Sequence, residues 1–397
     1  MNYKSIFFLV LGLDVLLLVL QISGLSISYY EANLLYNDFL PLQYLLKTSF
    51  LLFGQNDYTL RLPMILMHVL SVLLLFKISK NYVYSDRNRL WLSIIFILLP
   101  GVISSAIIVD SAGLILFGLL LFIYVYQNFS KNTLYPLLAF YVLLDGGFLL
   151  LFLGLALYSI SKKDKNFFIF NILAFFISLF LYGIDTHGTP KGHFLDSIGL
   201  YAAIFTPIIF IYIFYALYRK YLNKDMNVIW YISSTALIVS LSLSFRQKIH
   251  LEHFAPYLII ALPLMAQVFI HSYRVRLPIF RKKYKAVFAI TLGLLLVHST
   301  LVFLNKYIYV FIDNPKKHFA YKMHVAKELA TQLQSININC IDTDERMLKR
   351  LKFYNVTKCN NYHLTRNNLL DDINSDVTIS YKNRVIYKAT VTKLNIN

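Results

Sequence analysis

Charged residues are scarce in this chain. They make up 15% of its 397 residues, whereas 58% are hydrophobic and the mean hydropathy is +0.59. A soluble fold of this size carries about 25% charged residues. The composition therefore excludes a soluble globular protein. It predicts instead an α-helical polytopic membrane protein.

Cysteine is also rare, since only Cys340 and Cys359 occur, both near the C-terminus. An oxidising compartment outside the membrane permits a disulfide between them. The sequence does not fix the separation of the two residues, so a disulfide and two free thiols both stay open.

The motifs of nucleotide and hydrolase chemistry are missing. No GxGxxG follows a strand, no HExxH, CxxC or GxSxG occurs, and the segment 183–190 lacks the lysine of a P-loop. The net charge is +18, yet no basic face beside stacking aromatics indicates a nucleic-acid partner. No cofactor is indicated, and a divalent metal is an open possibility without a motif to support it.

Apolar segments dominate the first 304 residues. We interpret eleven of them as membrane spans, near 5–22, 63–80, 90–108, 111–127, 133–144, 146–160, 167–184, 198–217, 226–244, 255–270 and 286–304. The fifth and sixth are short and meet at residues 145–147, so a broken pair that does not fully cross is the alternative.

The basic residues sort onto one side of these spans. With the N-terminus in the cytoplasm, the cytoplasmic segments hold 18 Lys and Arg and the opposite loops up to residue 304 hold 5. Because basic residues are retained in the cytoplasm, this asymmetry supports a cytoplasmic N-terminus. An odd number of spans then places the C-terminal region outside.

The first outer loop, residues 23–62, contains two predicted helices. Ser28 and Glu31 have the spacing of a capping box, so Glu31 is interpreted as a helix cap, a role that does not exclude catalysis. Pro41 and Gly54 bound an apolar helix that is too short to span, which predicts that it lies in the membrane interface.

One acid, Asp14, falls inside the first span. Acids within membranes mark function by default. Pairing with a neighbouring helix is the equally open alternative.

The polar region 305–397 predicts a small outer α/β domain, distinct from the membrane domain 1–304. Its expected elements are a helix that Asn314 caps and Pro315 starts, with an apolar stripe to Ile336; a strand over 336–341; a helix opened by the segment 342–345; and a hairpin of 377–381 with 385–389. Asp342 and Asp344 imitate a metal-binding DxD pair, but helix capping explains them better.

Chemically suitable groups gather on the predicted outer face. The acids are Glu31, Asp38, Asp110 and Asp145, and the basic groups are Arg61, Lys191, His193, Arg246, Lys248, His250 and His253. A carboxylate accepts a proton from an acceptor hydroxyl, and clustered cations hold a lipid phosphate. Ordinary contact with lipid headgroups is the alternative for the basic segment.

Several motifs occur in a fixed order on that face. They are Tyr30-Glu31-Ala32, Asp38-Phe39-Leu40-Pro41-Leu42, Phe53-Gly54, Arg61-Leu62-Pro63, Val109-Asp110, and Arg246–Tyr257 with Pro263. Over residues 1–304 the chain thereby resembles the GT-C glycosyltransferases that use a polyprenyl-phosphate-linked sugar, the family-39-like branch of protein O-mannosyltransferases and lipid A aminoarabinose transferases.

The resemblance has departures. The family's paired acids are Tyr30 and Glu31 here, and the family's lysine before two prolines is Phe39. The resemblance therefore implies that Glu31 takes the catalytic carboxylate role with help from Asp110 or Asp38. It also implies that Arg246, Lys248, His250 or Arg61 binds the donor phosphate.

The implied function is an inverting transfer of a sugar from a polyprenyl-phosphate donor to an envelope glycan, lipid or protein, in contact with membrane lipids. The implied location is a bacterial inner membrane with the C-terminal domain in the periplasm. The alternative outside enzymology is a flippase or transporter of lipid-linked glycans, which predicts paired charges in mid-membrane and repeated spans. A ligase-like or polymerase-like enzyme is a third reading, although the late outer loops 185–197 and 244–254 are short.

The topology gives the first prediction. An alkaline phosphatase fused to the C-terminus should be active, because the enzyme folds only outside the cytoplasm and the charge asymmetry places residue 397 there. A fusion after Lys80 serves as the cytoplasmic control. An inactive C-terminal fusion would contradict the outer placement.

Overall fold

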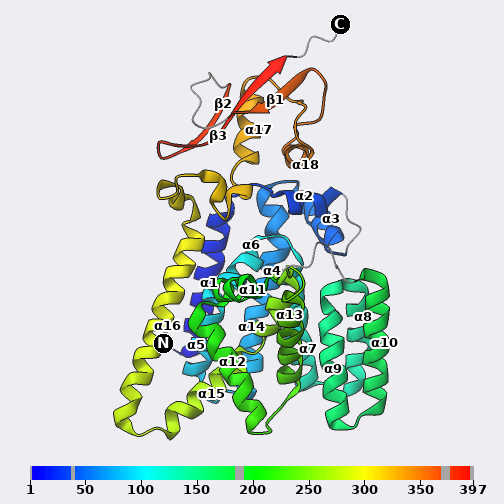
Figure 1. The fold of residues 1–397 in the computed structure, drawn as a ribbon, viewed down its shortest axis with the longest axis vertical. Coiled ribbons are helices and arrows are strands. Elements are labelled where there is room, and N and C mark those ends of the chain that lie inside the picture. Colours follow the sequence, from blue (N-terminus) through cyan, green and yellow to red (C-terminus); the bar gives the residue numbers. More distant parts are fainter. Residues whose placement is uncertain (1, 37–40, 184–191, 368–375, 394–397) are drawn as a thin grey trace. The chain divides into compact units, whose positions relative to one another are not determined.

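The computed structural model describes residues 2–36, 41–183, 192–367 and 376–393, which divide into two compact units (Figure 1). Unit 1 comprises Met1–Leu16 and Met64–Ser299, and unit 2 comprises Leu17–Pro63 and Thr300–Asn397. The division of the chain into 1–304 and 305–397 stays a prediction. In the structure, residues 17–63 belong to the same compact unit as the tail.

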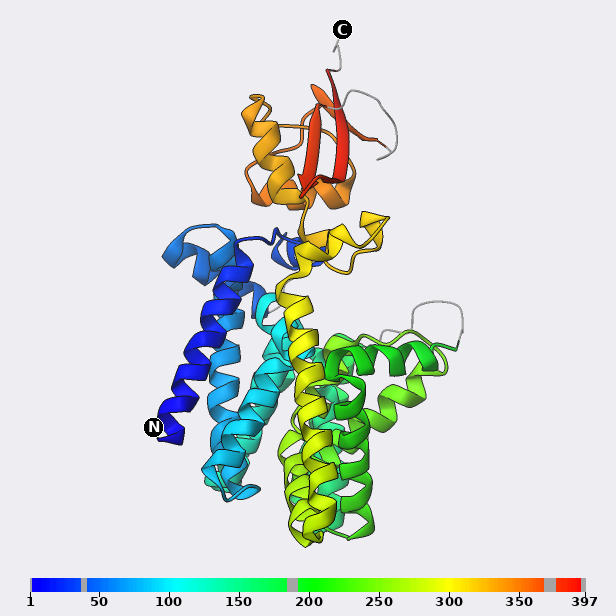
Figure 2. The ribbon, with the colours of Figure 1, turned by 90° about the vertical axis from the view of Figure 1, so that its left-hand side faces the viewer.

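Unit 1 is built from helices (Figure 2). Three helices have residues in both units: α1 (Tyr3–Ile22), α4 (Asp57–Ile78) and α16 (Pro278–Phe303). The others are α5 (Asp86–Leu98), α6 (Pro100–Ile107), α7 (Ser111–Asn128), α8 (Leu134–Leu144), α9 (Leu149–Lys162), α10 (Lys165–Tyr182), α11 (Phe194–Phe205), α12 (Pro207–Leu222), α13 (Val228–Ser244), α14 (Leu251–Ile259) and α15 (Leu262–Val275), with 3-10 turns η1 (Ser79–Asn81), η2 (Lys131–Thr133) and η3 (Gly146–Phe148).

The predicted spans all have counterparts among these helices. Within the described residues, six helices are long and apolar enough to cross a membrane, or up to eight if each bent pair counts as one span. The shorter apolar helices α8, α9 and α13 account for the remaining predictions. The fold class, a polytopic helical membrane protein, is confirmed.

Two predicted spans are bent rather than continuous. The pair α5 and α6 bends by 62° at Leu99-Pro100, and the pair α11 and α12 bends by 103° at Thr206-Pro207. Proline lacks the amide donor and pushes the preceding residue out of the helical region. Leu99 is accordingly extended, and Thr206 has φ +65°. The apolar pattern of these segments did not reveal the bends.

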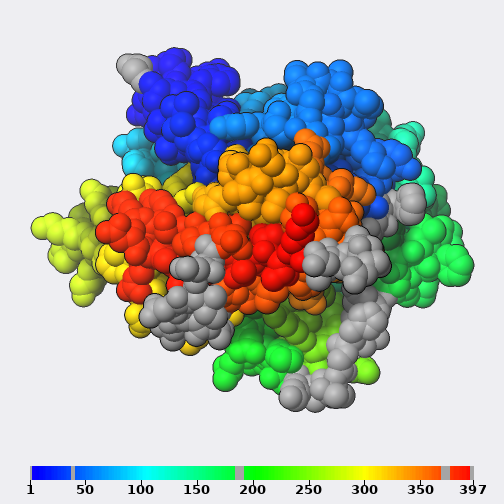
Figure 3. Space-filling view, turned by 90° about the horizontal axis from the view of Figure 1, so that it is seen from above, coloured from blue at the N-terminus to red at the C-terminus, as the bar shows by residue number. Residues whose placement is uncertain are grey.

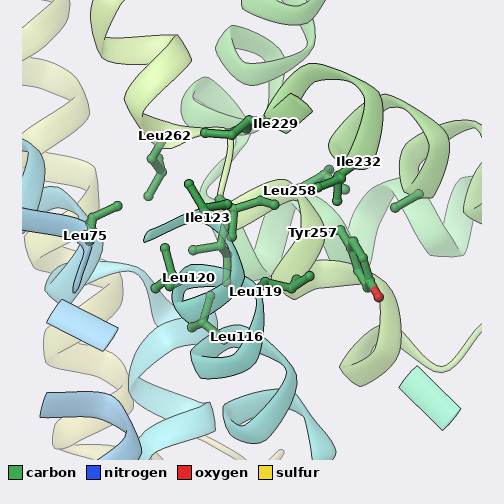
Figure 4. Packing of buried hydrophobic residues seen from close by; sticks show 14 of the residues in the cluster. Leu75, Leu116, Leu119, Leu120, Ile123, Ile229, Ile232, Tyr257, Leu258 and Leu262 are labelled. Carbon is green, nitrogen blue, oxygen red and sulfur yellow. The ribbon is translucent and has the colours of Figure 1, made fainter. Parts of the chain in front are cut away.

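The core of unit 1 lies around α7. Leu116, Leu119, Leu120 and Ile123 project from this helix among buried residues of α4, α13, α14 and α15 (Figure 4). This packing holds α7 and α14 together, and both helices carry candidate site residues at their N-terminal ends.

The buried acid Asp14 has a partner in unit 1. Its Oδ2 lies 2.6 Å from Nε2 of His68 on α4, and both side chains are almost fully buried. Pairing with a neighbouring helix, one of the two alternatives, is therefore observed.

Unit 2 combines the first loop with the tail. Its helices are α2 (Tyr29–Tyr36), α3 (Pro41–Phe53), α17 (Ala326–Ser335) and α18 (Glu345–Phe353), with 3-10 segments η4 (Asn305–Val310), η5 (Pro315–Lys317) and η6 (Tyr321–Met323). An antiparallel sheet of order β1-β3-β2 follows, formed by β1 (Tyr362–Arg366), β2 (Val377–Tyr381) and β3 (Arg384–Lys393). In register, Leu364 pairs with Val391 and Val377 pairs with Ala389.

Several local predictions in unit 2 are confirmed. The apolar helix after Pro41 ends at Phe53, and Gly54 follows with φ +78°. Asp344 caps α18 by accepting from Arg346 N and Met347 N. The hairpin turns at Lys382 and Asn383, whose positive φ values suit a type I′ turn.

The start of the long tail helix was predicted wrongly. Asn314 caps only the short η5, and the α-helix begins at Ala326. Ile336, where the predicted apolar stripe ends, is exposed, and so is Phe319 in the first part of the predicted helix. Separate short turns replace the first part of the predicted helix because His318 bonds to the backbone of Asn305 and Ala320 instead. The segment 336–341 forms an isolated bridge at Cys340 rather than a strand.

The two cysteines form a disulfide. Cys340 and Cys359 have Cα atoms 5.3 Å apart and are joined through sulfur. The disulfide lies beside the isolated β-bridge between Cys340 and Thr357. It therefore joins the segment that follows α18 to the segment that precedes α18.

We expect the double variant Cys340→Ser/Cys359→Ser to lower the free energy of unfolding by about 3 kcal/mol, because it opens a loop of 19 residues. Thermal unfolding of the full chain in detergent measures this loss, with the exposed Ser335→Ala as control. Wild-type protein should take up maleimide only after reduction. Labelling without reductant would contradict the disulfide.

Candidate active site

Asp145 is the centre of a polar cluster in unit 1. It lies between α8 and η3 and is 4% exposed. Its carboxylate accepts from Gly147 N at 2.7 Å and from Ser111 Oγ at 2.8 Å. The carboxylate thus caps the break between two short helices, which supplies the hydrogen bonds that a broken helix needs at membrane depth.

His253 on α14 lies beside this carboxylate. Its Nδ1 is 3.9 Å from Asp145 Oδ1, and its side chain is 39% exposed. The approach depends on Gly147, because a Cβ there would lie 2.8 Å from His253 Nδ1 and 2.1 Å from Ile115. One turn further along α14, the Tyr257 hydroxyl donates to Gly147 O at 2.6 Å, which fixes the glycine turn against this helix.

Asp110 is adjacent to the cluster through Ser111. It is half-buried and caps α7, accepting from Ala112 N at 2.9 Å. Asp145 thus lies beside an imidazole, and Asp110 precedes the serine that donates to Asp145. A carboxylate in such a setting can accept a proton from a hydroxyl. The sequence showed Asp145 and His253 as suitable groups, but nothing in the sequence indicated that they pair.

The predicted phosphate-binding residues Arg246, Lys248 and His250 lie between α13 and α14. All three are exposed, whereas Ile249 between them is buried and anchors the segment. His250 Nδ1 lies 3.8 Å from Glu252. The segment ends at the N-terminus of α14, the end of a helix that favours anions. His253 lies in the first turn of the same helix.

Glu31 lies in unit 2, where the capping box is confirmed. Its Oε2 accepts from Ser28 N at 2.7 Å, and its own amide donates to Ser28 Oγ at 3.3 Å. The side chain is fully buried and lies 3.7 Å from Nη2 of Arg61. Glu31 is thus a buried ion-pair partner in this structure as well as a helix cap.

Arg61 is likewise fully buried and joins two acids of unit 2. Besides Glu31, its Nη1 lies 3.8 Å from Asp57, and its Nη2 donates to Ser26 O at 3.0 Å. Asp57 also accepts from Tyr354 Oη at 2.7 Å and lies 2.8 Å from Lys327 Nζ. Burial, followed by the charge of Asp57, raises the pKa of Tyr354, so its hydroxyl remains a donor at neutral pH.

The predicted site residues fall into two groups. Asp110, Arg246, Lys248 and His250 belong to unit 1, whereas Glu31 and Arg61 belong to unit 2. Asp38 lies outside the described residues. Among the residues that the structure describes, no group of three or more His, Cys, Asp or Glu side chains is arranged to hold a metal ion.

Comparison with solved structures defines the class of fold, which is GT-C-like, as the resemblance implied. Two similar structures are of ArnT from Cupriavidus metallidurans. The apo structure gives a TM-score of 0.53 at 14% identity and covers 89% of this chain and 73% of that chain. The structure bound to undecaprenyl phosphate gives 0.54 at 13% identity and covers 88% and 73%. No protein-family model and no curated protein matches the sequence.

Arg61 gives a prediction about stability. Arg61→Met leaves the buried Glu31 and Asp57 without their shared cation, and breaking a buried ion pair by removing one partner costs about 3–5 kcal/mol. We expect a large fall in thermal stability and in the amount of folded protein in detergent. Arg246→Met, at an exposed position, is the matched control. Equal stability of both variants would contradict a structural role for the Arg61 network.

Proposed function

We propose that this chain is an inverting membrane glycosyltransferase that moves a sugar from a polyprenyl-phosphate donor to a glycan, lipid or protein acceptor on the outer face. The observation that carries the proposal is the GT-C-like fold, matched over 88% of the chain by ArnT bound to undecaprenyl phosphate. The charge asymmetry supports the face of the membrane.

Arg246, Lys248 and His250 bind the donor phosphate in this proposal. As the bond between the sugar C1 and the phosphate oxygen breaks, negative charge grows on that oxygen. Exposed cations beside the N-terminus of α14 stabilise this charge and hence the departing polyprenyl phosphate.

A carboxylate receives the proton of the acceptor hydroxyl. The acceptor oxygen then bonds to C1 on the face opposite the phosphate, so a single displacement inverts the configuration at C1. Asp110 and Asp145 with His253 offer such a group in unit 1, where the partly exposed imidazole connects a buried carboxylate to the surface.

We propose Glu31, Asp110 and Asp38 as catalytic carboxylates, and the two that the structure describes differ in their surroundings. Asp110 is half-buried, and its Oδ1 accepts from Ala112 N as the cap of α7. Glu31 is fully buried against Ser28 and Arg61, so an acceptor hydroxyl reaches it only where this packing opens. We therefore propose Asp110 as the first candidate for the base and Glu31 as the second.

The alternative function is transport of a lipid-linked glycan. The Asp14–His68 pair favours it, since paired ionisable groups within membrane helices are typical of transporters. The two functions differ in product. A transferase releases polyprenyl phosphate from the donor, whereas a transporter leaves the donor intact on the other leaflet.

The test of function is therefore a search for that product. Purified protein in nanodiscs receives a polyprenyl-phosphate-linked sugar, and mass spectrometry follows released polyprenyl phosphate. Mass spectrometry of glycolipids and glycoproteins from a deletion strain then identifies sugar and acceptor. Movement of intact donor without release would reject the transferase.

Asp110→Asn should reduce transfer by about 100- to 10,000-fold, because it removes the proposed base. Asparagine caps helices as well as aspartate does, so α7 and thermal stability should be preserved. Asp164→Asn is the matched control, since Asp164 caps α10 on the predicted cytoplasmic side.

Glu31→Gln should lower transfer together with thermal stability. A loss of transfer by Glu31→Gln at unchanged stability, with normal turnover by Asp110→Asn, would reverse this order and make Glu31 the base.

A further inference from the structure

Unit 2 contains a cavity that the proposed transfer chemistry does not use. It has a volume of about 370 Å³ and lies where α2 of the first loop meets η6, α18, β1 and β3 of the tail. Figure 3 shows the blue surface of the first loop against the orange surface of the tail segment that carries α17 and α18. The walls of the cavity therefore come from segments about 300 residues apart in sequence.

The walls are strongly cationic. Lys322, Arg346, Arg350 and Arg366 line the cavity, and the acid among the lining residues is Asp344. Both Asp344 oxygens accept backbone amides of α18 as its cap. In the part of the chain that the structure describes, none of the four cations lies within ion-pair distance of an acid, although the charge of Glu31 acts on Arg350. Four cations against the one lining acid leave the cavity with excess positive charge.

Arg350 fixes one of these charges in place. It is 7% exposed, and its Nε and Nη2 donate to Ile27 O at 3.0 Å and Lys322 O at 2.6 Å. Its Nη1 meets only the Met347 sulfur at 3.9 Å among the described residues, a weak acceptor. A buried guanidinium with a poorly used donor in a cavity wall favours an anionic ligand.

Tyrosine rings make up much of the remaining wall. Tyr29, Tyr30, Tyr321 and Tyr387 line the cavity, and Tyr30 is 66% exposed. Lys322 lies 5.1 Å from the Tyr30 ring centroid, and Arg366 lies 5.3 Å from that of Tyr387. Cation–π contacts thus position these cations and rings in the absence of a ligand. The resulting wall has apolar ring surface beside charged hydrogen-bond donors.

We propose that this cavity binds an anionic sugar residue, one that carries a carboxylate or a phosphate. The guanidinium and ammonium groups bind the anion, and the tyrosines contact the sugar ring. The volume lies at the low end of the range for ligand pockets, about 300–1,000 Å³, which suits one or two sugar rings. This inference rests on the proposed function. It implies that the acceptor is an acidic glycan.

Binding to the full chain in detergent tests the site directly. Saturation-transfer NMR and calorimetry compare glucuronic acid and glucose 6-phosphate with glucose and with inorganic phosphate. We expect both acidic sugars to bind at least about 10-fold more tightly than glucose and than phosphate, because charge and ring contacts both contribute. Lys322→Gln and Arg366→Gln should each weaken this binding about 10-fold. The exposed Lys317→Gln, outside the cavity, should not.

Other occupants give different results. Equal binding of glucose, or of inorganic phosphate alone, would overturn the inference. So would acidic sugars that fail to bind while soluble anionic lipid headgroups bind and respond to Lys322→Gln. Tyr30→Leu should weaken the acidic sugars but not inorganic phosphate, and an equal effect on both would remove the ring contact.

The binding measurement does not need transfer activity, so its outcome is separate from that of the proposed function. Where transfer is measurable, Lys322→Gln and Arg366→Gln should raise KM for an acidic acceptor and leave kcat unchanged. Normal KM together with absent binding would overturn the acceptor role alone.

Discussion

One constraint shapes unit 1: backbone amides and carbonyls within a membrane need hydrogen-bond partners from the protein itself. Continuous helices meet it without help, but unit 1 interrupts its helices repeatedly. At two of these breaks a carboxylate takes over, with Asp145 accepting from Gly147 N and Asp110 accepting from Ala112 N. The carboxylates that cap these breaks are therefore also the groups that we propose for the chemistry.

Short-range features of the fold were predictable. The Ser28–Glu31 capping box, the Asp344 cap and the hairpin at 382–383 involve residues within a few positions, where local sequence dictates local hydrogen bonds. The prediction of the tail helix failed because the hydrogen bond between His318 and Asn305, 13 residues apart, outweighs the local helix-start signal at Asn314. The bends after Leu99 and Thr206 were not predicted either. An apolar pattern indicates that a segment is buried, but it does not give the direction of the helix axis.

The candidate sites depend on pairings that no spacing rule reveals. The motifs indicated which residues could act, yet the partners came from elsewhere in the chain: His253 for Asp145, Arg61 for Glu31, and the tail for Tyr29 and Tyr30. A single sequence carries no signal for such contacts. The roles of Glu31 and of the basic segment before α14 accordingly remain proposals.

Unit 2 joins residues 17–63 to the last hundred residues of the sequence. Asp57 and Ile27, in the first loop, bond to Tyr354 Oη and Arg350 Nε, which are synthesised some 300 residues later. During biosynthesis the first loop is made long before the tail. Until the tail is present, the buried Asp57 lacks its partners Tyr354 and Lys327. A chain interrupted at any of the intervening helices lacks these partners, so the final structure of the first loop depends on the tail.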